Sequence, residues 1–494
     1  MRSSCFCLLL LSFLLLACAG NPDASANDSP EAVSNTMAGD RVEQEQVHWA
    51  NLGQELWVED PIFNGKLHLV EAGQQNSQTI LLIHGLGYRG MLDWEQVFPE
   101  LSDTYHVLAI DLPGFGSSDK QQVQYAPQKY ARLINWVVSQ YAHDSVIVIG
   151  HSLGGAVSLR FAHDYPEQVS RLIMVDTAGV LQRTVFIKYL AKVPVTYEWL
   201  APFQKAIPAL DRLIRRVASK ADGWTQSLLI TMDQLPDVPE LLMSSGLAQQ
   251  YLYKDRDTMN AALGLVYEDF SAAAREVEAP THIIWGEHDS VAPIRTGTVL
   301  AALLPNAELH VIRTAGHVPM TDNFDDFMVV LMQSLGNTPH AKQPQRRLAV
   351  IEKEMMSARN TRCDGQNNLV YTGRYGIFHI RNCRGVVLRD VVAESIELVG
   401  SEVTLENVKL NSLGVGLSAT NSVVTATLLQ IEANVGLEVE NSYLDLAGAD
   451  FIIRDKFVDI HTESQLYFSL SEYQQGTQKS PLHGVSLGAV LNVR

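Results

Sequence analysis

Six short apolar runs, separated by segments of helical pattern, constrain the fold of this chain more than any other feature. The runs are Thr79–His84, His106–Asp111, Ser145–Gly150, Arg171–Asp176, Thr281–Gly286 and Glu308–Thr314. Each is continuous and rich in Val, Ile and Leu, which is typical of strands buried on both faces of a parallel sheet. Helical segments such as Tyr130–Tyr141 and Gly155–Tyr165 lie between them. The alternation predicts an α/β domain over residues 47–337, with a doubly wound, mostly parallel sheet and a site at the carboxyl ends of its strands.

The stretch from about 181 to 270 interrupts this alternation. Its pattern is mostly helical, it contains no clear strand, and its first part is rich in apolar and aromatic residues between Phe186 and Phe203. An insertion between two strands of such a sheet would sit above their carboxyl ends. We therefore expect a helical cap over the site, with most of these apolar side chains forming the cap's own core.

The chain changes character after Gly336. We expect a linker over residues 338–362 and a second, all-β domain over residues 363–494. In that domain a polar residue or Gly followed by a small residue recurs with spacings of 18, 21, 20 and 22, at Asn382-Cys383, Gly400-Ser401, Asn421-Ser422, Asn441-Ser442 and Glu463-Ser464. A repeat of short strands near 20 residues is the signature of a solenoid. We expect a right-handed parallel β-helix of about five coils, and a small β-sandwich is the alternative.

The N-terminus is typical of an exported protein. Arg2 provides a positive charge, Leu8–Leu16 is almost wholly apolar, and Leu15-Leu16-Ala17-Cys18 places a small residue before a cysteine. The apolar segment is too short to span a bilayer, so we expect residues 1–17 to be a secretory signal. The ending resembles the bacterial lipoprotein signal, which implies cleavage before Cys18 and lipidation of that residue. Ala19 rather than Asp after it favours the outer membrane, and an ordinary signal with a chance cysteine is the alternative.

Residues 18–46 and the overall charge bear on how the chain would attach to a membrane. The segment after Cys18 is rich in Asn, Ser, Ala, Asp and Glu, so we expect a disordered tether with a reach of roughly 30 Å. The formal net charge of -18 argues against a nucleic-acid partner and against electrostatic adhesion to anionic lipid. The lipid anchor is therefore the expected means of attachment to the bacterial cell envelope.

Cysteine usage agrees with export. Cys5 and Cys7 would leave with the signal and Cys18 would carry lipid, so Cys363 and Cys383 remain. Their separation of 20 residues is one coil of the expected solenoid, so the two could stack and form a disulfide. Two free buried thiols are the alternative.

The motif Gly150-His151-Ser152-Leu153-Gly154 follows an expected strand and precedes an expected helix. In this context G-x-S-x-G is a nucleophile elbow, a turn so tight that the residues beside the serine must lack bulk. Ser152 is therefore the candidate nucleophile. We do not expect His151 to act as its base, because the His151 side chain projects away from the tip of the turn.

A serine hydroxyl needs a base, and the base needs an acid that orients it. His317 follows the last strand and is the candidate base. Asp289, in Trp285-Gly286-Glu287-His288-Asp289 after the fifth strand, is the candidate acid, with Asp176 as the second choice.

A developing oxyanion needs two backbone donors. We expect the amides of Leu153 and Leu86 to supply them, the second from the loop His84-Gly85-Leu86-Gly87. His84 is expected to support that loop through a side-chain hydrogen bond. Neither a metal-ligand spacing nor a phosphate-binding loop is evident, so we expect no metal and no cofactor.

Together these motifs resemble the α/β-hydrolase superfamily, in the branch with esterases, lipases, meta-cleavage-product hydrolases and cofactor-free haloperoxidases. The resemblance covers residues 60–337 and rests on His84-Gly85, the Asp111–Asp119 segment, Gly-His-Ser-Leu-Gly, Trp-Gly-Glu-His-Asp289 and Gly316-His317, in the family's order. It implies a triad of Ser152, Asp289 and His317. Ser rather than Asp at the elbow argues against the dehalogenase and epoxide-hydrolase members.

The expected function is hydrolysis of a carboxylic ester through an acyl-enzyme on Ser152. The apolar cap favours an apolar acyl group, such as a lipid ester. Hydrolysis of C–C bonds, thioesters or lactones uses the same triad and stays open. A different class is a cell-envelope binding or scaffold protein whose solenoid recognises a glycan or protein partner.

Overall fold

The computed structural model describes residues 52–87, 89–181, 257–337, 339, 358–461 and 464–487. The chain divides into Met1–Asn51 and a compact unit of Leu52–Arg494. The expected signal peptide, Cys18, the tether, most of the cap and most of the linker lie outside the described residues, so those expectations stay predictions. Among the described residues, no helix combines the length and apolar character that crossing a membrane requires.

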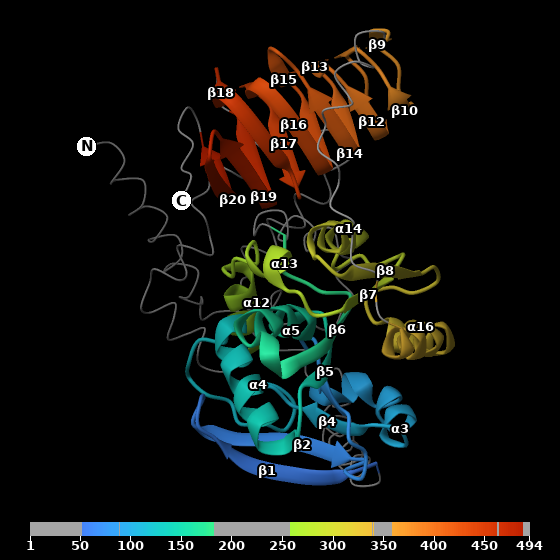
Figure 1. The fold of residues 1–494 in the computed structure, drawn as a ribbon, viewed down its shortest axis with the longest axis vertical. Helices are drawn as coiled ribbons and strands as arrows, with labels where there is room; N and C mark the ends of the chain where they lie inside the picture. The colour runs from blue at the N-terminus through green and yellow to red at the C-terminus, as the bar shows by residue number, and fades with distance from the viewer. Residues whose placement is uncertain are drawn as a thin grey trace, which may run out of the picture. The chain divides into compact units, whose positions relative to one another are not determined.

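The first part of the compact unit is built on an eight-stranded sheet in the order β1-β2-β4-β3-β5-β6-β7-β8 (Figure 1). The strands are β1 Gln54–Asp60, β2 Gly65–Ala72, β3 Thr79–Ile83, β4 His106–Ile110, β5 Val146–His151, β6 Val169–Val175, β7 Thr281–Gly286 and β8 Ala307–Ile312. The pairs β1–β2 and β2–β4 are antiparallel, and the remaining pairs are parallel. The six apolar runs of the sequence are β3 to β8, which confirms the predicted α/β class.

Helices fill the connections between these strands. They are the 3-10 helices η1 Gly90–Trp94 and η2 Pro166–Gln168, and the α-helices α3 Val97–Ser102, α4 Pro127–Tyr141, α5 Leu153–Asp164, α12 Asp257–Val266, α13 Ala273–Glu276, α14 Ile294–Leu303, α15 Pro319–Asp322 and α16 Phe324–Gly336. Helix α5 packs on both β5 and β6 and against α4, and its residues from Leu153 to Ala162 are all buried. This buried helix fixes the exit of the chain from the central strand β5.

The C-terminal part is all-β, and its strands stack in parallel coils (Figure 1). The strands are β9 Thr361–Asp364, β10 Val370–Arg374, β11 Ile377–Arg381, β12 Val386–Ala393, β13 Ser395–Val399, β14 Glu402–Asn411, β15 Val415–Thr420, β16 Val423–Glu440, β17 Tyr443–Ala447, β18 Asp450–Ile460, β19 Gln465–Gln475 and β20 Gln478–Leu487. Val386, Val403, Val424 and Leu444 stand in register on successive strands and are buried. The parallel stacking is that of a β-helix-like solenoid rather than a sandwich; the antiparallel hairpin β19–β20 was not predicted.

The recurring dipeptides mark the corners between coils. At Asn382, Asn421 and Asn441 the first residue of the pair has φ between 44° and 53°, a conformation that asparagine tolerates well. The second residue forms a hydrogen-bonded ladder. The backbone amides of Cys383, Ser401, Ser422 and Ser442 each donate to the hydroxyl of the serine one coil later, over 2.9 to 3.2 Å. The repeat seen in the sequence therefore satisfies buried backbone donors at each corner.

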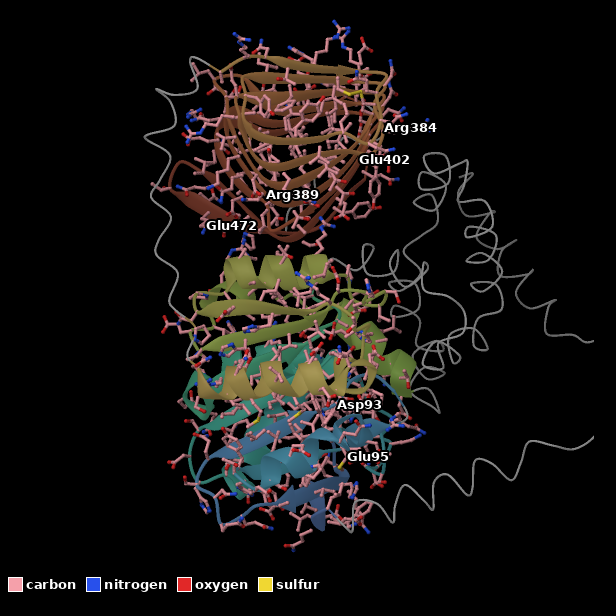
Figure 2. The ribbon with its side chains drawn as sticks, turned by 90° about the vertical axis from the view of Figure 1, so that its right-hand side faces the viewer. Asp93, Glu95, Arg384, Arg389, Glu402 and Glu472 are labelled. Atoms are coloured by element: carbon pink, nitrogen blue, oxygen red, sulfur yellow. A yellow bond between two sulfur atoms is a disulfide. The ribbon has the colours of Figure 1, made fainter. Side chains whose placement is uncertain are left out.

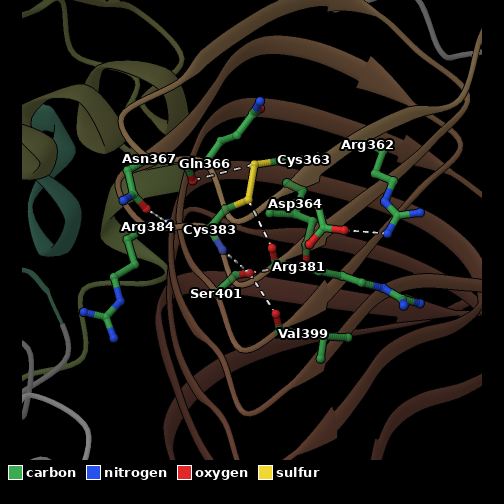
Figure 3. Close-up of a disulfide and its surroundings, with 11 residues drawn as sticks. Arg362, Cys363, Asp364, Gln366, Asn367, Arg381, Cys383, Arg384, Val399 and Ser401 are labelled. Carbon is green, nitrogen blue, oxygen red and sulfur yellow. Dashed lines mark hydrogen bonds and ion pairs between the residues drawn. A yellow bond between two sulfur atoms is a disulfide. The ribbon is translucent and has the colours of Figure 1, made fainter.

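A disulfide joins Cys363 and Cys383 at the start of the solenoid (Figure 3). Both cysteines are buried, and Cys363 pairs in register with Ile380 on the next coil. The bond links two consecutive coils, as the one-coil spacing suggested. The alternative prediction, two free buried thiols, is therefore wrong.

The solenoid contacts the first part of the compact unit through two arginines. Arg295 on α14 pairs with Asp445 on β17 at 2.7 Å and also donates to the Thr427 hydroxyl. The side chains of this pair are 10% and 2% exposed, so the charges are buried together. Arg275 on α13 pairs with Glu472 on β19 at 3.2 Å. Apolar residues of β17 and β19 join the same core as the α/β sheet.

Removing one member of the buried pair should destabilise the protein strongly. The Asp445→Ala variant leaves the Arg295 guanidinium buried without its carboxylate, which is expected to lower the free energy of unfolding by about 3 kcal/mol. Urea denaturation followed by fluorescence and circular dichroism would measure the change. Arg389→Ala is the matched control, because Arg389 and Glu406 form an exposed pair on the same solenoid. Equal midpoints for the two variants would contradict a stabilising role for the buried pair.

Candidate active site

The turn between β5 and α5 carries Ser152 in a strained conformation. Its φ is 52° and its ψ is -112°, in a region that residues with a side chain rarely occupy. The glycines on either side leave no room for a Cβ. A Cβ on Gly150 would lie 2.2 Å from the Gly154 carbonyl oxygen, and one on Gly154 would lie 2.2 Å from the Ile83 carbonyl oxygen. The geometry is that of the expected elbow.

The structure brings Ser152, His317 and Asp289 together, although they come from three different loops. The Ser152 hydroxyl lies 3.0 Å from His317 Nε2, and His317 Nδ1 lies 2.8 Å from Asp289 Oδ2. With Nδ1–H donating to the carboxylate, Nε2 has a lone pair that faces the serine hydroxyl. This is the arrangement of nucleophile, base and orienting acid that acyl transfer requires.

The Asp289 carboxylate is held ionised at the end of β7. Its Oδ1 accepts hydrogen bonds from the amides of Val291 and Ala292, at 2.7 and 2.9 Å. Burial alone would raise the pKa of Asp289, but the charge and hydrogen bond of His317 outweigh it, so the pKa is lowered. An ionised acid stabilises the imidazolium that forms when His317 takes a proton.

Asp176, the second choice for the acid, lies at the end of β6 behind Asp289. It accepts a hydrogen bond from the Gly286 amide at 2.9 Å, and its backbone has φ of 42°. Complete burial, together with the negative charge of Asp289, raises the pKa of Asp176 well above its usual range. His317 Nδ1 donates its hydrogen bond to Asp289 and not to Asp176. Asp176 is therefore a protonated neighbour of the acid.

The loop that holds Leu86 lies directly beside the elbow. A Cβ on Gly85 would lie 3.1 Å from the Ser152 Cβ, while Leu153 begins α5 on the other side of the serine. His84 supports the loop through hydrogen bonds. Its Nδ1 lies 2.7 Å from the Gly85 carbonyl oxygen, and its Nε2 accepts a hydrogen bond from the Leu112 amide. This is the supporting position expected for His84.

Asp93 in η1 is a part of the site that sequence reasoning missed (Figure 2). Its Oδ2 accepts from the Gly85 amide at 3.1 Å and lies 3.3 Å from His151 Nδ1. His151 Nε2 in turn lies 2.8 Å from the His317 carbonyl oxygen. Burial would raise the pKa of Asp93, but its hydrogen bond and charge interaction with His151 prevail and lower it. A lone aspartate after an apolar loop gave no signal in the sequence.

Two groups of side chains in the described residues bring metal-ligating atoms within 4.8 Å of one another. One is Asp176, Asp289 and His317, which belong to the arrangement above, and the other is His282, Glu308 and His310 on β7 and β8. The contacts between serine, histidine and aspartate need no ion for acyl transfer.

The sequence of this chain is similar to those of known hydrolases. A family model described as the alpha/beta hydrolase fold matches residues 78–324. An uncharacterized protein of Mycobacterium tuberculosis is 30% identical over 281 residues, which cover 55% of this chain and 80% of the relative. A 2-hydroxy-6-oxononadienedioate/2-hydroxy-6-oxononatrienedioate hydrolase of Klebsiella pneumoniae is 26% identical over 279 residues, covering 55% of this chain and 91% of that protein. The crystal structure of a putative lipase from Acinetobacter baumannii matches with 24% identity and a TM-score of 0.42, over 63% of this chain and all of that one.

The two aspartates should respond differently to replacement by asparagine. Asp289→Asn is expected to lower kcat about 10⁴-fold, since the His317 tautomer is no longer fixed. Asp176→Asn mimics the protonated acid and should keep kcat/KM within about tenfold. Steady-state assays of both variants would measure this, and equal losses would contradict the assignment of the acid.

Asp176→Asn should also change how stability depends on pH. The pKa of Asp176 is raised in the folded protein, so the folded state keeps a proton that the unfolded chain releases above about pH 4. This linkage lowers the free energy of unfolding of the wild type as the pH rises, and the variant lacks the linkage. The stability of Asp176→Asn relative to wild type should therefore increase from pH 4.5 to pH 7.5 in urea denaturation. A constant difference would show that Asp176 is ionised in the folded protein.

Proposed function

This chain belongs to the alpha/beta hydrolase fold family, and from that premise we propose that it is a serine hydrolase that cleaves a carboxylic ester through an acyl-enzyme on Ser152. The observation that carries the proposal is the hydrogen-bonded series from the Ser152 hydroxyl through His317 to Asp289. Ser152 stands on a strained turn, next to the loop that contains Leu86.

In the proposed reaction His317 takes the Ser152 proton while the serine oxygen attacks the ester carbonyl. The carbonyl oxygen becomes an oxyanion, which the amides of Leu153 and Leu86 stabilise. Collapse of this intermediate expels the alcohol, which takes the proton from His317, and leaves the acyl group on Ser152. A water molecule activated by the same histidine then releases the acid.

An apolar acyl group is the proposed substrate feature. The apolar and aromatic composition of the expected cap supports it. The second candidate is hydrolysis of a C–C bond in a vinylogous keto acid. The Klebsiella relative, a hydrolase of 2-hydroxy-6-oxononadienedioate and 2-hydroxy-6-oxononatrienedioate, favours this alternative.

Hydrolysis of p-nitrophenyl esters across acyl lengths tests the proposal. Ser152→Ala should lower kcat/KM by at least about 10⁴-fold on every ester that the wild type cleaves. Ser139→Ala is the matched control, because Ser139 lies exposed near the end of α4 and should leave the rate unchanged. Residual activity equal to that of the wild type in Ser152→Ala would refute the nucleophile. Activity on a 2-hydroxy-6-oxodienoic acid, with none on any ester, would favour the C–C reaction.

We further propose that the protein is anchored to the bacterial outer membrane by lipid on Cys18. The apolar run followed by Leu-x-Ala-Cys supports this, as does the acidic charge, which leaves electrostatic attachment unfavourable. The solenoid would then stand in the cell envelope, where its long exposed surface suits a glycan or protein partner.

Replacement of Cys18 should release the protein from the membrane. In Cys18→Ser the lipid acceptor is lost, so the chain should leave the outer-membrane fraction and appear in the periplasmic fraction or, where the signal stays uncleaved, in the inner-membrane fraction. Density-gradient fractionation with immunoblotting would show this. Cys5→Ser removes a cysteine that leaves with the signal and should not change the distribution. A wild-type protein found wholly in the periplasmic fraction would refute the anchor.

A further inference from the structure

Three side chains with metal-binding donors lie together on β7 and β8. His282 is the second residue of β7, whereas Asp289 follows the carboxyl end of that strand. Glu308 and His310 lie on β8, the last strand of the sheet. The parallel register pairs His282 with Glu308 and Ile284 with His310, so the three side chains project from the same face. The cluster therefore lies toward the opposite ends of these strands from the triad.

Hydrogen bonds determine which nitrogen of His282 is available to a ligand. Its Nε2 lies 3.1 Å from the Asn337 carbonyl oxygen, which can only accept, so Nε2 carries the hydrogen. Nδ1 then presents its lone pair toward His310, whose Nε2 is 3.1 Å away. Histidines that bind a metal usually donate their second N–H to a carbonyl or carboxylate in this way.

The charges around the cluster also bear on a bound cation. Neutral imidazoles and an ionised carboxylate are the forms that bind one. The opposing group is Arg171 on β6, whose charge acts on His282 and whose guanidinium contacts the carbonyls of Ser334 and Asn337. The carboxylate of Glu308 offsets that positive charge.

The distance between the two histidine nitrogens fits their coordination of a single metal ion. Two nitrogens each about 2.0–2.1 Å from a tetrahedral zinc lie roughly 3.3 Å apart, close to the separation of the two histidine nitrogens. Two imidazoles and one carboxylate suit Zn²⁺, whereas Ca²⁺ and Mg²⁺ prefer oxygen ligands throughout. His282 is buried and His310 is half-buried, while Glu308 is exposed, so a fourth position faces solvent.

We propose that His282, Glu308 and His310 form a Zn²⁺ site that links β8 to β7 and to the chain at the end of α16. The site is separate from the triad and takes no part in ester cleavage. Without zinc, His310 Nε2–H donates directly to His282 Nδ1, so the two histidines form a plain hydrogen bond.

Calorimetric titration of the full, detergent-purified chain with ZnCl₂, after removal of metals with EDTA, tests the site. We expect one Zn²⁺ per chain, and a loss of affinity of at least about 100-fold in both His310→Gln and Glu308→Gln. These two residues are the less buried members, so their variants should fold, which circular dichroism would check. Co²⁺ in place of Zn²⁺ should give a visible absorption band typical of a tetrahedral site, absent from both variants.

Two further variants make the outcome decisive. His143→Gln removes a histidine from the loop after α4 and should bind Zn²⁺ as the wild type does. His317→Ala removes the histidine of the other cluster and should also retain binding. The proposal is overturned if the wild type binds no Zn²⁺, if binding persists in His310→Gln, or if only His317→Ala abolishes it.

Discussion

The strained turn at Ser152 is the constraint on which the rest of the site depends. A positive φ at a residue with a side chain costs on the order of 1–3 kcal/mol, so the surrounding structure must enforce it. It is enforced by β5, which lies between β3 and β6, and by α5, whose first ten residues are all buried. The chain must pass directly from the one to the other, and only glycines at positions 150 and 154 allow that approach. Burial of the strand and helix thus holds the serine at the strand's end.

Buried charges then connect the loops that surround this turn. Asp93 binds the Gly85 amide and faces His151, and His151 faces the carbonyl oxygen of His317. One carboxylate therefore supports both the loop with the expected oxyanion donor and the backbone of the expected base. Its lowered pKa keeps it ionised, so it accepts the hydrogen bond of the Gly85 amide and faces His151 as a charged group. Asp289 plays a corresponding part on the other side of His317, with two backbone amides holding its second oxygen.

The sequence allowed prediction of those parts whose signal is local. Continuous apolar runs marked β3 to β8, and the elbow motif and the order of Ser152, Asp289 and His317 indicated the triad that the structure brings together. Strands β1 and β2 escaped prediction because their apolar stretches are short: Leu56–Val58 lies between acidic residues, and His68 interrupts Leu67–Val70. Asp93 escaped because its partners, 8 and 58 residues away, meet it only in the fold. In the solenoid, the repeated dipeptides were visible, but their role as a hydrogen-bonded ladder depends on contacts between coils.

Arg295, which contacts the solenoid, lies close in sequence to Asp289, the expected acid. Asp289 accepts hydrogen bonds from Val291 and Ala292, α14 begins at Ile294, and Arg295 in its first turn reaches Asp445 of the solenoid. Trp285, buried in β7, closes the same segment by donating to the Ala292 carbonyl oxygen. A loop fixed at both ends by buried groups has little freedom, because moving it would expose or unpair a charge. The solenoid thus pairs with the helix that directly follows the loop of Asp289, whose carboxylate lies 2.8 Å from His317 Nδ1.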